Sequence, residues 1–344
     1  VGVVMITDAV AADIREQVKA KVEDILEITL VANPIMHHLL LGINPVELGG
    51  APFALTTDTA VEMPARELDL QINHGGRIYI LPCIAGHVGA DTAGVILSEE
   101  PQQQKAMTLL VDVGTNAEIV LGDKNRLLAC SSPTGPAFEG AQISAGQRAA
   151  AGAIERVRID PDTLVARFKV IGSDLWSDEP GFIEETSKFG VTGICGSGII
   201  EVVAEMYLSG IVTVDGIIDG ELASRSPLVV ADGRTWSYVL YQSDLTENQA
   251  PILVTQNDIR QIQLAKAALY AGVKLLMDKL DIDHVDRIRL AGAFGSHINV
   301  QHAMVLGLIP DCALNQVSSA GNAAGTGARI ALLNNQSRNT IEDL

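Results

Sequence analysis

The chain has 344 residues, with 24 Lys and Arg against 42 Asp and Glu, so its formal net charge at pH 7 is −18. Hydrophobic residues make up 47% and charged residues 19%, which excludes a disordered chain, because disorder requires low hydrophobicity and high charge. The acidic excess argues against a protein that wraps a nucleic-acid backbone, since such proteins need basic surfaces. The length allows one large domain or two medium ones.

Neither a membrane span nor a secretion signal is predicted. No apolar run reaches the roughly 18 residues of a spanning helix, and no basic segment precedes the apolar residues 1–4. The four cysteines are scattered and form no CxxC pair: Cys83, Cys130, Cys195 and Cys312. This spacing favours reduced thiols over a disulfide framework or a zinc site. We therefore expect a cytoplasmic protein with neither membrane nor nucleic-acid partners.

The first part of the chain is predicted to mix helices and strands. Expected elements are a helix at 9–24, a strand at 25–31, a helix at 34–41, an irregular segment at 43–76, a strand at 77–80 and a helix at 88–97. The second of these helices has the clearest start, because Asn33 is a good N-cap and Pro34 suits the first helical position.

After residue 105 the pattern changes to three short apolar runs separated by turn residues. Runs at 108–113, 117–122 and 127–131 predict a three-strand meander. Further expected elements are a helix at 141–155, short strands and loops at 156–190, a helix at 197–208, a loop-rich insertion around 210–256, a helix at 258–280, a strand at 287–290 and helices at 300–306 and 322–333. Strands that alternate with helices indicate an α/β fold.

The longest predicted helix also has the strongest local signals. Apolar residues recur at helical spacing from Ile259 to Leu280. Thr255, with Asp258 three residues later, resembles a capping box in which Asp replaces the usual Glu.

The strongest chemical signal is LLVDVGTNAEIVLG at 109–122, a strand, a tight turn and a second strand. Gly114 would let a ligand approach the backbone, while Thr115 and Asn116 could bind phosphate oxygens. Asp112, at the end of a buried strand, could hold Mg²⁺ through water or orient an attacking water. An ordinary β-hairpin with Gly and Asn in its turn explains the same residues equally well.

Two further glycine-rich turns could bind other parts of a nucleotide. GICGSGII at 193–200 runs into a helix, where free N–H groups and the helix dipole favour an anion. The segment 288–310 contains the turn AGAFG, whose small residues would admit a flat purine, and a similar turn precedes the helix at 322–333. Close packing between helices and strands also favours Gly and Ala, so each motif by itself is weak.

Several common site motifs are missing from the sequence. There is no GxSxG nucleophile turn and no GxxxxGK[ST] phosphate loop. His37 and His38 are neighbours on a predicted helix, so their side chains face different directions and do not make a metal pair.

The order of the motifs resembles the second lobe of the actin, sugar-kinase and heat-shock chaperone superfamily. More specifically, it resembles the ATPase part of the ferredoxin-linked reductive activators of corrinoid proteins. The segments that carry this resemblance span nearly the whole chain: 35–53, 109–122, 135–143, 193–200 and 290–310. The combination is far more specific than any one motif.

The resemblance implies an α/β fold of two ribonuclease H-like lobes, with mixed sheets flanked by helices and a cleft between them. We expect the first lobe at 1–105, without its N-terminal hairpin, and the second at 106–344, with the insertion around 210–256. Carried over by position, the second phosphate loop is Asp112, Gly114, Thr115 and Asn116, the phosphate side of the cleft is Gly196, Ser197 and Gly198, and the adenosine motif is Gly292, Ala293, Phe294 and Gly295. Asp112 is expected to hold the metal ion or to position the attacking water, and Glu118 and Glu139 are further catalytic candidates.

The implied function is ATP-dependent reduction of an inactive Co(II) corrinoid to Co(I). ATP and Mg²⁺ are the expected cofactors, and the expected partner is a corrinoid protein or a corrinoid-dependent methyltransferase. A homodimer is a possible assembly. ATP would act by shifting the two lobes between states with different affinity for the partner.

Two departures from the family pattern shape these expectations. No DxG[TS] precedes residue 109, and the four scattered cysteines cannot hold the [2Fe–2S] cluster of the relatives. We therefore expect this chain to be the C-terminal part of a longer protein, with the cluster in a domain outside it and an incomplete ATP site of its own.

Two other functions stay open at this point. A small-molecule kinase of the same superfamily would need a substrate base, for which the sequence offers no candidate. A non-catalytic adaptor would bind a corrinoid or methyltransferase protein without useful ATPase activity.

Overall fold

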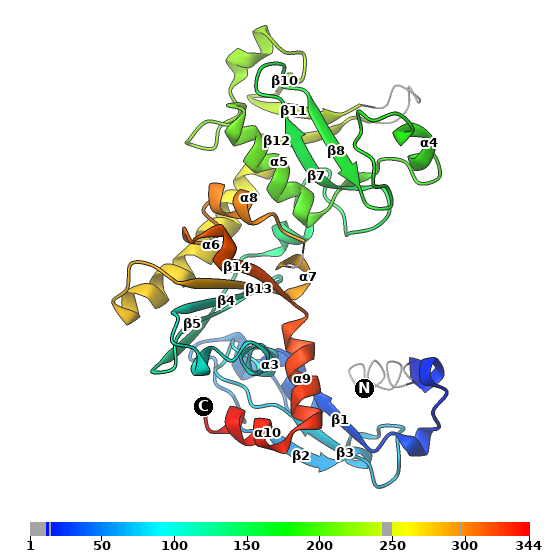
Figure 1. Cartoon of the computed structure of the whole chain (residues 1–344), viewed down its shortest axis with the longest axis vertical. Coiled ribbons are helices and arrows are strands. Elements are labelled where there is room, and N and C mark those ends of the chain that lie inside the picture. Colours follow the sequence, from blue (N-terminus) through cyan, green and yellow to red (C-terminus); the bar gives the residue numbers. More distant parts are fainter. Residues whose placement is uncertain (1–11, 14, 243–249, 296) are drawn as a thin grey trace. The chain divides into compact units, whose positions relative to one another are not determined.

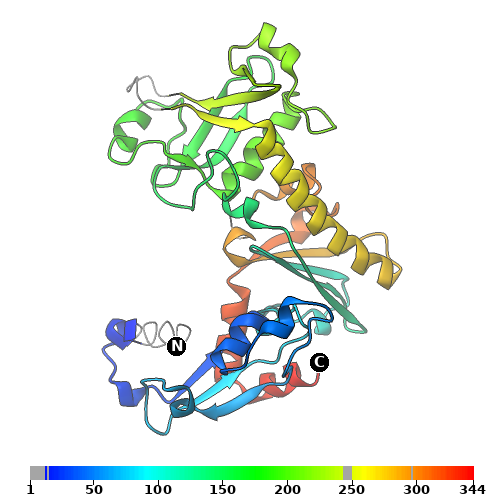
Figure 2. The ribbon, with the colours of Figure 1, turned by 180° about the vertical axis from the view of Figure 1, so that it is seen from behind.

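The computed structural model (Figures 1 and 2) describes residues 12–13, 15–242, 250–295 and 297–344. The chain divides into two compact units. The first comprises Val1–Asp112, Glu118–Ser131 and Ala320–Leu344, and the second comprises Val113–Ala117 and Ser132–Ser319. No helix among the described residues combines the length and the apolar character that crossing a bilayer demands.

The first unit contains a small mixed sheet. Its strands are β1 (Glu27–Leu30), β2 (Val61–Pro64) and β3 (Arg77–Ile80), in the order β1-β3-β2. β1 runs parallel to β3 and β2 runs antiparallel to it. Ile78 and Ile80 of the central strand are fully buried, and they pack with Leu40 of α2 (Pro34–Leu40). Burial of these side chains holds helix α2 on the sheet.

Helices α3 (Ala90–Glu99) and α9 (Ala323–Leu333) form the closest helix pair of this unit (Figure 1). A Cβ atom added to Gly327 would lie 1.9 Å from the carbonyl oxygen of Gly94. The two backbones therefore touch at a point where only glycine fits. Helix α10 (Asn335–Glu342) follows α9, and its Arg338 donates a hydrogen bond of 2.7 Å to Glu27 of β1.

The expected meander is confirmed. β4 (Thr108–Val113), β5 (Ala117–Gly122) and β6 (Leu127–Ser132) are neighbours in that order. β4 and β5 are buried along nearly their whole length, as expected of strands covered on both faces.

The second unit contains two further three-stranded sheets. In one, β7 (Ala153–Ile159) lies between β8 (Ala166–Val170), which is antiparallel, and β9 (Gly193–Ile194), which is parallel. Helix α5 (Gly196–Leu208) packs on β7. The other sheet is antiparallel, with β10 (Val229–Asp232), β11 (Thr235–Tyr241) and β12 (Ile252–Thr255) in that order.

Helix α6 (Gln256–Leu280) continues directly from β12 (Figure 2), and its start confirms the expected capping box. Thr255 accepts a hydrogen bond from the N–H group of Asp258, and the Asp258 carboxylate accepts one from the N–H group of Thr255. The remaining elements are α4 (Phe182–Thr186), β13 (Arg287–Ala291), α7 (Gly292–Gly295), α8 (Val300–Val305), β14 (Val317–Gly321) next to β13, and short 3-10 helices at Val22–Asp24, Val46–Gly49, Ala65–Leu68, Pro101–Gln103, Pro136–Glu139, Gly220–Ser224 and Leu314–Gln316.

The helix predicted at 141–155 is wrong. These alanine-rich residues form turns and the start of β7. Gly152 has a positive φ of 88°, and Ser144 turns its N–H group to the carboxylate of Asp258 at 2.7 Å. Gln147 donates its N–H group to the carbonyl oxygen of Ile194. Helix propensity is a weak preference, and these tertiary hydrogen bonds override it.

Three other segments differ from expectation. The stretch 43–76 is not wholly irregular, because it contains β2, and the loop-rich stretch 210–256 holds a complete antiparallel sheet. Part of the helix expected at 9–24 lies outside the described residues, at 9–11 and 14; its described part ends before Lys19, which has a positive φ of 55°.

Candidate functional site

The turn between β4 and β5 carries the DxGT motif and is ordered by hydrogen bonds to more distant residues. Gly114 donates its N–H group to the carbonyl oxygen of Asn116 at 2.9 Å. The hydroxyl of Thr134 donates to the carbonyl oxygens of Gly114 and Thr115, at 3.3 and 3.2 Å. The hydroxyl of Thr115 donates to the carboxylate of Glu139 at 2.7 Å. The turn is therefore more than a local hairpin, and it brings two predicted site residues, Thr115 and Glu139, into contact.

Gly114 is not required by packing. A Cβ atom at this position would meet only the carbonyl oxygen of Asn116, at an ordinary 3.5 Å, and the glycine does not need a positive φ. Thr115, Asn116 and Glu139 are all exposed. The surface of this turn is thus open, as a loop that receives phosphate oxygens would need to be.

Two predicted carboxylates, Asp112 at the end of β4 and Glu118 in β5, belong to a partly buried acidic group in the first unit. Burial, together with the nearby negative charge of Asp91, raises the pKa of Asp112 to about 6. Burial and the charges of Asp91 and Asp112 raise the pKa of Glu118 to about 7, against the lowering effect of a hydrogen bond from Ser131. The charge of Asp91 thus opposes ionisation of both carboxylates, and the charge of Asp112 opposes that of Glu118.

Asp91 is the third member of this group, and the sequence analysis missed it. It lies in the first turn of α3, where its carboxylate accepts a hydrogen bond of 2.8 Å from the N–H group of Thr92, and burial raises its pKa. An acidic residue in the first turn of a helix is common because it complements the helix dipole. The sequence alone therefore could not distinguish Asp91 from many similar residues.

The GSG turn opens helix α5. Cys195, the N-cap residue, makes no side-chain hydrogen bond to the first turn, so the N–H groups that have no partner within a helix stay available there. The hydroxyl of Ser197 pairs with the thiol of Cys195 at 3.3 Å. Gly198 has a packing role of its own, because a Cβ atom there would lie 2.2 Å from the carbonyl oxygen of Ile154 in β7.

The predicted adenosine motif forms the short helix α7, directly after β13. Gly292 has a positive φ of 82°, which other residues adopt at a cost, and a Cβ atom on Gly295 would lie 2.8 Å from the backbone of Leu290. The side chains of Ala293 and Phe294 lie outside the described part of the structure. After this motif the chain passes His297 and enters α8, which Asn299 caps by accepting the N–H group of His302.

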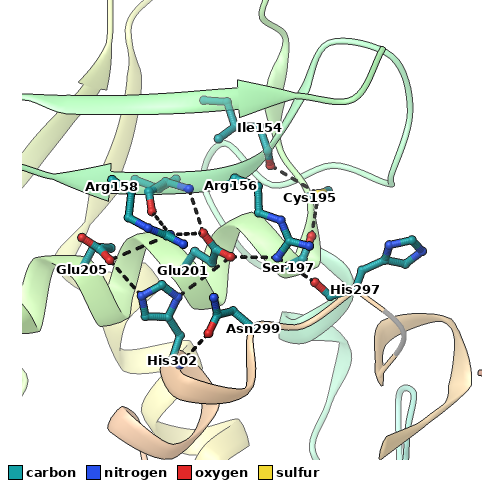
Figure 3. Close-up of polar contacts among 11 residues, drawn as sticks. Ile154, Arg156, Arg158, Cys195, Ser197, Glu201, Glu205, His297, Asn299 and His302 are labelled. Carbon is teal, nitrogen blue, oxygen red and sulfur yellow. Dashed lines mark hydrogen bonds and ion pairs between the residues drawn. The ribbon is translucent and has the colours of Figure 1, made fainter. Parts of the chain in front are cut away.

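A polar cluster of the second unit, which the sequence analysis also missed, lies between α5, β7 and α8 (Figure 3). Glu201 is fully buried and accepts hydrogen bonds from Arg156 at 2.8 Å and Arg158 at 2.6 Å. Glu205 contacts His302 at 2.8 Å. The sequence shows only two carboxylates four residues apart on one predicted helix. The arginines and the histidine that pair with them come from β7 and α8.

No group of three or more His, Cys, Asp or Glu side chains in the described ranges is placed to hold a metal ion. This does not conflict with a magnesium nucleotide, because Mg²⁺ usually takes one or two carboxylates and completes its shell with water and phosphate oxygens. The Asp112 carboxylate suits the role of a Mg²⁺ ligand, since a cation beside it would offset the repulsion within the acidic group.

Comparison with known proteins connects these features to one family. Residues 106–344 match the C-terminal domain of RACo, the ASKHA domain, and residues 2–104 match the RACo middle region. The corrinoid activation enzyme RamQ of Eubacterium limosum is 35% identical over 321 residues, which cover 91% of this chain and 51% of that protein. The Co(II) methylated amine-specific corrinoid protein reductase of Methanosarcina barkeri is 27% identical over 266 residues, covering 74% and 44%.

A solved structure agrees with these relatives. The reductive activator for corrinoid, iron-sulfur protein superposes with a TM-score of 0.81 at 31% identity, over 98% of this chain and 51% of that one. The chain thus spans about half the length of the relatives it matches. The fold class is confirmed as the actin-like ASKHA fold, with mixed sheets flanked by helices. With its middle region and ASKHA domain both matched, this chain belongs to the RACo family.

Proposed function

We propose that this chain is the ATP-binding part of a reductive activator that returns an inactive Co(II) corrinoid protein to Co(I). The observation that carries the proposal is the match of residues 106–344 to the RACo ASKHA domain, because this span contains the DxGT, GSG and GAFG turns. The names of two relatives, a corrinoid activation enzyme and a Co(II) corrinoid protein reductase, support the reaction.

In this proposal the β4–β5 turn binds the terminal phosphates. Thr115 and Asn116 are exposed in a turn that Thr134 and Glu139 hold in shape, and their backbone N–H groups are the proposed phosphate donors. Glu139 accepts the hydrogen bond from Thr115, so its carboxylate lies beside the phosphate loop, where it can orient and deprotonate an attacking water. The GSG turn supplies further N–H groups, and the GAFG turn receives adenosine.

Asp112 is the residue that would hold Mg²⁺, directly or through water. When bound, the ion neutralises charge on the transferred phosphate. Asp112 must lose its proton to serve this role, and its pKa of about 6 leaves it ionised at neutral pH. Asp91 adds negative charge near this position, and Glu118 adds more once the pH rises above its pKa of about 7.

The reaction adds one electron to Co(II). We assign the electron to a [2Fe–2S] domain outside this chain, and the coupling energy to ATP. A nucleotide can drive such a change only through its differential affinity for two states of the protein. The homodimer and the division into two ribonuclease H-like lobes at residue 105 stay predictions.

The test combines the chain with a Co(II) corrinoid protein and a low-potential chemical reductant. Absorbance of the Co(I) corrinoid should rise only when ATP and Mg²⁺ are both present, and phosphate should be released in parallel. Phosphate transfer to a small acceptor would instead identify a kinase. A melting temperature that ATP leaves unchanged would favour a non-catalytic adaptor.

A further inference from the structure

Helix α5 supplies the hydrogen bonds that one edge of β7 lacks. β9 pairs with β7 only at Ala153 and Ile154. Beyond that point the N–H group of Val157 donates to Glu201 at 3.0 Å, and the N–H group of Ile159 donates to Glu205 at 3.0 Å. Side chains of α5 thus take the place of a neighbouring strand, which fixes the helix along β7.

The buried carboxylate of Glu201 fixes two arginines in turn. An unpaired charge at a fully buried position would be costly, and Arg156 and Arg158 provide the pairing. Their side chains keep similar exposed fractions, 34% and 37%. The two arginines are therefore alike in their salt bridge to Glu201 and in their access to solvent.

The two arginines differ in their further contacts. The guanidinium of Arg158 lies 6.0 Å from the centre of the Trp176 ring and 3.9 Å from Glu205, whereas Arg156 reaches the loop after the adenosine motif. Nη1 of Arg156 also donates to the backbone carbonyl oxygen of His297 at 3.0 Å (Figure 3). His297 lies two residues after Gly295, the end of the predicted adenosine motif. A second connection runs from Glu205 to His302 of α8, at 2.8 Å. The chain that leaves the adenosine motif is thus attached to α5 and β7 at two points.

The same helix begins with the GSG turn. Gly198 packs on the carbonyl oxygen of Ile154, and Cys195 donates its N–H group to that same oxygen at 3.0 Å. Ile154 and Arg156 are two residues apart on β7. One short segment of this strand therefore anchors the proposed phosphate turn through its backbone and the loop after the adenosine motif through a side chain.

From this geometry we propose that Arg156, held by Glu201, is a positioning residue for adenosine binding. Arg156 fixes the loop at His297 and thereby the GAFG turn, which is the proposed adenosine site. The GSG turn at the start of α5 is the proposed phosphate site. The inference rests on the proposed ATP site and assigns a nucleotide-specificity role to a side chain outside the three glycine-rich motifs.

The test compares Arg156→Ala with Arg158→Ala by calorimetry, using ATP, adenosine and tripolyphosphate as ligands. Both changes remove one cation from Glu201, but only the first removes the bond to His297. Arg156→Ala should weaken ATP and adenosine binding about tenfold, the size of one lost hydrogen bond to a charged donor, and leave tripolyphosphate binding unchanged. Arg158→Ala should leave adenosine binding unchanged, even where it lowers the melting temperature by the same amount.

Other outcomes separate the possible failures. Equal effects of the two changes on adenosine, or an equal loss of adenosine and tripolyphosphate binding in Arg156→Ala, would mean that Arg156 only stabilises the fold. Arg156→Lys keeps a charged donor beside Glu201 and within reach of His297, so it should recover adenosine binding in part. Failure of the unaltered chain to bind ATP would overturn the proposed function, and this inference with it.

Discussion

Thr115 and Glu139 are joined by a hydrogen bond of 2.7 Å, donated by the threonine hydroxyl, although they lie 24 positions apart in the chain. The carboxylate is thereby fixed beside the DxGT turn. This position supports the proposed catalytic role of Glu139, which the sequence could suggest only by resemblance.

Glu139→Gln should slow ATP hydrolysis by about 100-fold, because an amide cannot accept the proton of an attacking water. ATP affinity should stay nearly constant, since the amide keeps the size of the side chain and can still pair with Thr115. Phosphate release and calorimetry measure the two quantities. Glu184→Gln, an exposed change on α4, is the matched control. Unchanged turnover in Glu139→Gln would remove Glu139 from the mechanism.

Asp91→Asn should shift the pH dependence of hydrolysis to lower pH. In its proposed role Asp112 acts as a carboxylate, so at limiting Mg²⁺ the turnover of the unaltered chain should rise with pH through about 6, the pKa of Asp112. The charge of Asp91 is one cause of that raised pKa, and its removal makes Asp112 easier to ionise. A pH profile at limiting Mg²⁺ measures the shift, because a bound cation would itself lower the pKa of Asp112. Asp69→Asn, an exposed change in the same unit, is the control. An unmoved midpoint would contradict the assignment.

His37→Leu should make the protein more resistant to acid. His37 is fully buried, and neither ring nitrogen has a hydrogen-bond partner among the described residues. Burial, together with the charge of His38, lowers its pKa from 6.5 to about 4. The unfolded chain therefore binds the proton more readily than the folded chain. His37 leaves the free energy of unfolding unchanged above pH 6.5 and lowers it progressively as the pH falls from 6.5 toward 4.

Urea unfolding measures this effect. Between pH 7.5 and about 4.5 the free energy of unfolding of the unaltered chain should fall by at most roughly 3 kcal/mol through His37, and His37→Leu should not show this loss. His38→Leu is the contrasting variant. The ring of His38 pairs with the carbonyl oxygen of Pro34 and the N–H group of Thr56, so its removal should destabilise at every pH. Parallel pH curves for the unaltered chain and His37→Leu would disprove the prediction.

Gly327→Ala should destabilise the protein by about 1–3 kcal/mol, because the added methyl group overlaps the backbone of Gly94 and forces α3 and α9 apart. The free energy of unfolding in urea measures the loss. Arg329→Ala, on the exposed face of the same helix, should change it by less than about 0.5 kcal/mol. Equal stabilities of the two variants would show that the helices can separate at little cost.

Elements with a strong local pattern could be predicted from the sequence. Helix α6 has apolar residues at helical spacing and its own capping box, and the meander β4–β6 consists of apolar runs separated by turn residues. These signals lie within a few residues of one another, so no knowledge of the rest of the fold is needed to read them. The DxGT turn was found for the same reason.

Features that depend on distant partners could not be predicted. The helix expected at 141–155 does not form. Turns precede β7 in this segment, because hydrogen bonds to Asp258 and Ile194 hold Ser144 and Gln147 in place. In the sequence, Asp91 looks like any acidic residue in the first turn of a helix. Only the folded structure shows that its charge lies near Asp112 and raises the pKa of that carboxyl.

The tie from Arg156 to His297 joins residues 141 positions apart. By itself the sequence determined the local elements, the order of the motifs and the resemblance to an ATPase family. Only the tertiary structure decided which charges are buried together and which loops they hold, because these depend on contacts between segments that local patterns do not encode.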